Sequence, residues 1–133
     1  MIEQLISFKV AKLAHEKGLR MNTCTLVYED TGKLESIGRY KDKYWAWEPN
    51  FISALTLGEF QYWLRTQQIF IDILTDRTVE PKFSYQINKF VGNPNDLTEK
   101  EWYWEEPIIS QYLYRTYEEC LEEAEQEALK LLP

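Results

Sequence analysis

The chain has 133 residues and a formal net charge of −7, with 44% hydrophobic and 15% aromatic residues. This size and composition suit one sizeable core, so we expect residues 1–133 to form a single domain. The acidic balance argues against direct nucleic-acid binding, because phosphate backbones are bound by clustered Lys and Arg. No apolar run approaches the roughly 20 residues of a membrane span, and the start lacks a basic, apolar leader. We therefore expect a cytoplasmic protein without membrane contact.

The first predicted element is a helix over residues 7–17. Ser7 suits its N-cap, because a hydroxyl can accept a hydrogen bond from a free N–H of the first turn, and Gly18 suits a left-handed residue at the other end. Residues 23–29 then alternate in polarity and lead through a glycine-containing turn to a returning strand over residues 34–37. The chain is thus expected to open with a helix and a hairpin.

The middle of the chain predicts a second helix and a second hairpin. Residues 38–49 have neither a helical nor a strand period, which indicates a loop or a short edge strand. Thr56 and Glu59 form a Thr-x-x-Glu capping box, in which each side chain can accept a hydrogen bond from the other residue's N–H, and they predict a helix start. Alternation over residues 69–74 and 83–88 predicts two antiparallel strands.

The last segment predicts a third helix. Thr98 and Glu101 could cap a single turn, and Thr116 with Glu119 forms a second capping box. The stripe expected to be buried comprises Tyr117, Cys120, Leu121, Ala124, Ala128, Leu131 and Leu132. The elements together predict an α+β fold, with three helices packed on one antiparallel sheet of three to five strands.

Three segments resemble a known group of proteins. The runs TLGEFQYWLR (56–65) and TYEECLEEAEQEALKLL (116–132), with ISFKVAKLAHEKG near the start, resemble small uncharacterised proteins of gut bacteria and of their phages and mobile elements. The resemblance implies a genomic neighbourhood and carries no known activity, catalytic residue or cofactor. The C-terminal run is also similar to the closing helix of a bacterial antitoxin family, but Cys120 replaces the expected alanine and the antitoxin role is not transferred.

Two aromatic clusters are the candidate interaction surface. Trp and Tyr dominate the energetics of protein interfaces, and such rings could equally stack on sugars. The alternative is that at least one ring of each cluster turns into the core. An exposed cluster could also be a homodimer interface. The candidate residues are Trp45, Trp47, Trp102, Tyr103 and Trp104.

The C-terminal part of the chain concentrates the acidity. Ten glutamates and only two basic residues lie between residues 99 and 127. The glutamates Glu118, Glu122 and Glu125 fall away from the apolar stripe and form a candidate acidic face. This face is either simply solvated, or it engages a basic partner, as a DNA-mimic inhibitor would.

Catalytic motifs are absent from the sequence. His15 is the only histidine, and Asp72, Asp76 and Glu80 are the carboxylates that could share a site near the second hairpin. The two cysteines, Cys24 and Cys120, belong to no metal-binding or catalytic pattern, so we predict buried thiols, no metal and no cofactor. The favoured hypothesis is a non-catalytic domain of phage or mobile-element origin that binds an unknown protein partner. The alternatives are a small enzyme or ligand-binding domain with a carboxylate and histidine pocket, and an acidic DNA mimic.

Overall fold

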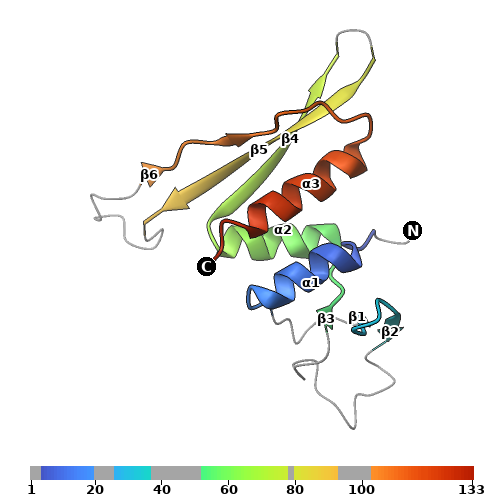
Figure 1. The fold of residues 1–133 in the computed structure, drawn as a ribbon. Coiled ribbons are helices and arrows are strands. Elements are labelled where there is room, and N and C mark those ends of the chain that lie inside the picture. The colour runs from blue at the N-terminus through green and yellow to red at the C-terminus, as the bar shows by residue number, and fades with distance from the viewer. Residues whose placement is uncertain (1–3, 20–25, 37–51, 78–79, 93–102) are drawn as a thin grey trace. The chain divides into compact units, whose positions relative to one another are not determined.

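The structure, a computed structural model, describes residues 4–19, 26–36, 52–77, 80–92 and 103–133. The predicted α+β class is confirmed: the described residues form three helices, and their strands form two antiparallel sheets where the sequence predicted one (Figure 1). The chain divides into two compact units, residues 1–60 with 132–133 and residues 61–131. The single-domain organisation of residues 1–133 stays a prediction.

Helix α1 (Phe8–Glu16) of the first unit begins and ends as its sequence predicts. The hydroxyl of Ser7 accepts a hydrogen bond from the N–H of Val10 at 3.1 Å. At the other end Gly18 has a φ of 98°, a left-handed conformation that a β-carbon would strain. The buried residues of the helix are Val10, Ala11 and Ala14.

The three-stranded sheet of the first unit has the order β2-β1-β3. Strand β1 (Leu26–Tyr28) pairs antiparallel with β2 (Leu34–Ser36), which confirms the first predicted hairpin, and also with β3 (Ile52–Ser53). Gly32 in the hairpin turn has a φ of 92°, and a ring carbon of Phe8 lies 3.4 Å from where its β-carbon would be. The turn therefore favours glycine for its backbone conformation, and a β-carbon there would be in van der Waals contact with Phe8.

Helix α2 (Leu57–Thr66) starts with the predicted capping box. The N–H of Thr56 donates to a carboxylate oxygen of Glu59 at 3.0 Å, and the N–H of Glu59 donates to the Thr56 hydroxyl at 3.2 Å. Leu55 and Phe60, on either side of the capping box, are both fully buried, as in a hydrophobic staple. Local sequence thus determines where this helix begins.

The corner between α2 and β4 (Ile69–Asp76) is formed by Gln68. This residue has a φ of 65°, which is a strained backbone conformation for a residue other than glycine. Its side-chain amide donates to the carbonyls of Phe90 at 2.8 Å and Gly92 at 2.9 Å, and its own carbonyl accepts from the N–H of Phe90 at 2.9 Å. These hydrogen bonds offset the strain and fix the start of β4 against the next strand.

Strands β4 and β5 (Lys82–Val91) confirm the second predicted hairpin. Eight residues of β4 each face one residue of β5, from Ile69 opposite Lys89 to Asp76 opposite Lys82. The pairing has no interruption over its whole length. It forms the frame of the four-stranded sheet in the second unit.

A discontinuous third row covers the other side of β5. Strand β6 (Tyr103–Trp104) pairs with the end of β5, β7 (Ile108–Ile109) with its middle, and Tyr114 forms a single bridge with Phe83. Between β6 and β7 the row has one residue more than the stretch of β5 that it faces, and between β7 and Tyr114 it has two more. This side of the sheet is therefore irregular, unlike the side formed by β4.

Helix α3 (Tyr117–Leu129) packs along β4 and β5 (Figure 1). Its N-cap is Thr116, whose hydroxyl accepts a hydrogen bond from the N–H of Glu119 at 3.1 Å. The predicted stripe is buried at Cys120, Leu121, Ala124, Ala128 and Leu132. Tyr117 was also expected in that stripe and is instead exposed, with its ring edge-on to Phe83 at 6.0 Å.

Some expectations lie outside the described residues. These are the loop or edge strand at 38–49, the buried thiol of Cys24 and the single helical turn predicted after Thr98. Within the described part of the chain, none of the helices has the length and apolar character needed to cross a membrane.

Candidate interaction surface

The four-stranded sheet has a face opposite α3, here called the outer face. Directly opposed residues of an antiparallel pair project to the same side, and successive residues alternate between sides. Since Tyr85 and Ile87 are buried on the α3 side, the even-numbered residues of β4 and β5 project from the outer face. The even-numbered residues with large apolar or hydrogen-bonded polar side chains on this face are Phe70, Asp72, Leu74, Gln86, Asn88 and Phe90. Trp104 and Ile109, which lie opposite Phe90 and Gln86, join them.

An aromatic cluster of Phe70, Phe90 and Trp104 occupies one end of the outer face. The Trp104 ring contacts Phe70 at 5.4 Å and Phe90 at 5.3 Å between centroids, both edge-to-face. The two phenylalanines are half-buried, while Trp104 remains 53% exposed. The indole is therefore oriented by two packed rings and still presents half of its surface to a partner.

A polar row crosses the middle of the outer face. The side-chain amide of Asn88 donates to a carboxylate oxygen of Asp72 at 3.3 Å, and that of Gln86 donates to the Asn88 side-chain oxygen at 3.2 Å. Asp72 is exposed, so its carboxylate can still accept hydrogen bonds from outside. The aromatic cluster thus borders a row of prearranged polar groups.

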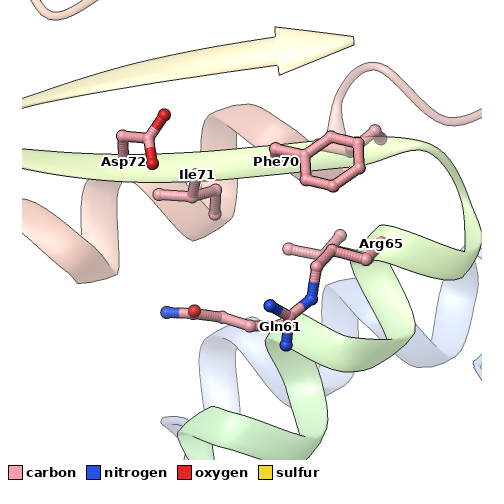
Figure 2. A pocket seen from close by; sticks show the side chains of 7 residues that line it. Gln61, Arg65, Phe70, Ile71 and Asp72 are labelled. Atoms are coloured by element: carbon pink, nitrogen blue, oxygen red, sulfur yellow. The ribbon is translucent and has the colours of Figure 1, made fainter. Parts of the chain in front are cut away.

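A small hollow lies between α2 and β4, entirely within the second unit (Figure 2). Its volume is about 100 Å³. Figure 2 shows Gln61 and Arg65 on the helix side, across from Phe70, Ile71 and Asp72 on the strand. Cofactor sites usually measure several hundred Å³, so this hollow suits a side chain more than a cofactor.

The predicted interaction residues are only partly described. Trp45, Trp47 and Trp102 lie outside the described residues. Tyr103 and Trp104 are exposed, as the interaction hypothesis requires, but strand alternation places their side chains on opposite sides of the sheet. Only Trp104 joins the aromatic cluster on the outer face.

The predicted acidic face of α3 is wrong for one of its three residues. Glu118 is exposed and Glu122 is half-buried, but Glu125 is 1% exposed. Burial, with a smaller contribution from the charge of Glu122, raises the pKa of the Glu125 carboxyl to about 8. One of its oxygens has no hydrogen-bond partner among the described residues. Glu125 therefore belongs to the packed side of the helix, and the exposed charge is smaller than predicted.

The groups of the enzymatic alternative are not brought to one place. Asp72 is exposed in the middle of β4, Asp76 ends the strand, and Glu80 is exposed in the loop that follows. The hollow includes Asp72 alone of these carboxylates, and His15 belongs to α1 in the first unit. Across the part of the chain that the structure describes, no three His, Cys, Asp or Glu residues are grouped as metal ligands.

Two titratable groups, one on α3 and one on β5, have raised pKa values because they are buried. Burial raises the pKa of the Cys120 thiol to about 11, so it stays protonated and is a poor nucleophile. Burial, reinforced by the neighbouring Tyr114, raises the pKa of Tyr85 to about 12. Both groups are packing residues of the sheet and helix.

The sequence reasoning missed the two phenylalanines of the cluster. Phe70 falls on the side of the predicted hairpin that alternates with the buried isoleucines, where polar residues are expected, and Phe90 continues that side two residues beyond the predicted strand 83–88. Two large rings on a predicted solvent face are a detectable signal. What could not be read from the sequence was that Trp104 would lie beside them.

Comparison with known proteins identifies no relative. No protein-family model matches the chain, and no significant match was found among curated proteins or solved structures.

Proposed function

We propose that this protein is a non-catalytic interaction domain that binds a protein partner through the outer face of its four-stranded sheet. The observation that carries the proposal is Trp104, which is half exposed yet oriented by contacts with Phe70 and Phe90. Because the ring is already ordered, binding loses little further side-chain entropy, which is typical of the aromatic anchors of interfaces.

The surroundings of Trp104 suggest the chemistry of the partner. The polar row of Asp72, Asn88 and Gln86 offers a carboxylate and amide groups beside the aromatic cluster. An apolar anchor next to satisfied polar groups is the usual composition of an interface centre and its rim. We therefore propose a partner with an apolar pocket for the indole and a basic or N–H group that reaches Asp72.

The other hypotheses have less support. The sequence resemblance alone suggests a phage or mobile-element origin, so an accessory role in such an element stays part of the proposal. A DNA mimic needs an extended acidic surface, and the burial of Glu125 removes one of the three expected carboxylates. For the enzymatic alternative, no observation favours a shared site for His15 and the hairpin carboxylates.

A peptide selection tests the proposal. A displayed library of random peptides is selected on the immobilised protein, and the enriched peptides are measured against wild type, Trp104→Ala and Tyr62→Ala. Tyr62 is a matched control, because it is an exposed aromatic residue on α2. Loss of an interface anchor typically costs about 2 kcal/mol or more, so Trp104→Ala should weaken binding by about thirtyfold, while Tyr62→Ala leaves it unchanged. Failure to enrich any peptide, or equal binding by both variants, would refute the proposal.

A further inference from the structure

The outward side of β4 is an edge of the four-stranded sheet as far as the described residues go. The N–H of Phe90 donates to the carbonyl of Gln68, and this pattern alternates along an antiparallel pair. The even-numbered residues of β4 therefore bond to β5. The N–H and C=O groups of Ile69, Ile71, Ile73 and Thr75 point the other way, and no described strand pairs with them. The edge thus offers a template for another strand.

This edge lacks several features that normally protect an edge strand. Proteins usually guard such strands with charged side chains, above all lysine, or with proline, a bulge or a very short length. The charged residues within β4 are Asp72 and Asp76. Strand β4 has eight residues in unbroken register with β5, and its sequence IFIDILTD contains neither Lys nor Pro. The opposite side of the sheet has the short β6 and β7, Pro107 and two shifts of register. The contrast indicates that the β4 edge is kept regular for pairing.

The charges beside this edge are complementary across a two-fold axis. Arg65, exposed on α2, lines the hollow beside Phe70 near the start of β4 (Figure 2). Asp76 ends the strand, where it lies opposite Lys82 of β5. Antiparallel pairing with a second copy, centred on Ile73, places Asp76 of that copy opposite Phe70 and so beside Arg65. By symmetry, the same ion pair forms twice.

Other registers are less favourable because they oppose like charges or leave Asp76 outside the paired stretch. An axis at Asp72 sets that carboxylate against its own copy, and an axis at Leu74 sets Asp72 against Asp76 of the second copy. Like charges directly opposed destabilise a strand pair. Axes at Ile71 and at Ile73 each pair three of the four outward residues with one another and oppose no carboxylates. Only the axis at Ile73, whose paired stretch is residues 70–76, includes Asp76.

We propose that β4 pairs antiparallel with β4 of a second copy, about a two-fold axis at Ile73, with Arg65 of each copy bound to Asp76 of the other. The pairing joins two four-stranded sheets into one. It uses the edge of the sheet and not the Trp104 surface, so it stands or falls independently of the proposed function.

Charge reversal tests the proposal on the full chain by sedimentation velocity over micromolar to near-millimolar concentrations. Wild type should show a concentration-dependent dimer. Arg65→Glu and Asp76→Lys should each weaken it by about tenfold, since each places two like-charged pairs in the interface. Arg115→Glu, an equal reversal at an exposed site away from β4, should not weaken it. Far-UV circular dichroism checks that each variant folds.

Mixing the two variants provides the decisive result. One copy with Arg65→Glu and one with Asp76→Lys regain opposite charges at both ends, so the mixture should form a heterodimer as tight as the wild-type dimer. Thr75→Pro, which removes an outward N–H without touching the bonds to β5, should weaken the dimer and leave the fold intact. A protein that is monomeric throughout, a dimer that none of these changes affects, or a mixture that fails to associate overturns the proposal. Binding of a peptide from another protein to the β4 edge, without any dimer, would also overturn the proposal.

Discussion

Replacing Glu125 with glutamine should remove most of the protein's loss of stability between acidic and mildly alkaline pH. The carboxyl is buried on α3, and its pKa in the folded state is raised to about 8 from an ordinary 4.5. A protonated carboxyl is neutral and tolerates burial, whereas the carboxylate does not. Below pH 4.5 the carboxyl is neutral in both the folded and the unfolded state, and its contribution to stability is fully present. This contribution is lost as the pH rises through the folded-state pKa of about 8.

The structure sets the size of the effect. A rise in pKa from 4.5 to about 8 corresponds to an upper limit of about 5 kcal/mol, because one pKa unit is worth about 1.4 kcal/mol. Local rearrangement and water entry reduce such penalties, so we expect Glu125→Gln to gain about 2 kcal/mol over wild type near pH 8. Near pH 4.5 the two proteins should differ little, since both side chains are then largely neutral.

Urea denaturation at the two pH values, followed by far-UV circular dichroism, measures the difference in free energy of unfolding. Glu123→Gln is the matched control, because it removes the same charge from an exposed position on α3. The control should retain the wild-type dependence on pH. Equal loss of stability with pH in wild type and in Glu125→Gln would refute the reasoning.

Two further predictions concern packing and capping. Thr56→Ala should lower the free energy of unfolding by about 1 kcal/mol, because it breaks the capping box of α2. Thr31→Ala, at an exposed turn, is the control and should change the free energy of unfolding little. Chemical denaturation measures both variants, and equal effects would contradict the capping role. In a Cys24→Ser background, the buried thiol of Cys120, with its pKa raised to about 11, should react with a disulfide reagent only as fast as the protein opens. Rapid labelling of the native protein would show that this thiol is accessible.

The helix starts could be predicted because their causes are local. Ser7, Thr56 and Thr116 each accept a hydrogen bond from an N–H three residues later, so the signal is complete within one turn of the sequence. The long strands of the second hairpin have enough residues to reveal their alternation. Both kinds of element are therefore determined by short stretches of chain.

The third row of the larger sheet could not be predicted in the same way. Strands β6 and β7 have two residues each, too few to show a period, and their register shifts relative to β5. Their position depends on backbone groups that β5 offers from more than ten residues away. Because Trp104 lies in β6, the aromatic cluster was also beyond the reach of local patterns.

Glu125 was misplaced because residue type and position disagree. It follows Leu121 by four residues and precedes Leu129 by four, so helical geometry puts it on their buried side. Carboxylates are seldom buried, so the residue type alone favours the solvent side. A pattern built only from apolar residues cannot find a polar residue that the fold encloses.

The irregular third row also limits how far copies of this protein can assemble. A sheet with two regular edges can add strands at both ends without limit, which leads to fibres. In the four-stranded sheet, β4 forms an unbroken edge, while the row from β6 to Tyr114 shifts register twice. Two copies joined through β4 would expose only these irregular rows at their outer ends. The assembly would then close at two, which makes the uneven row a safeguard against aggregation.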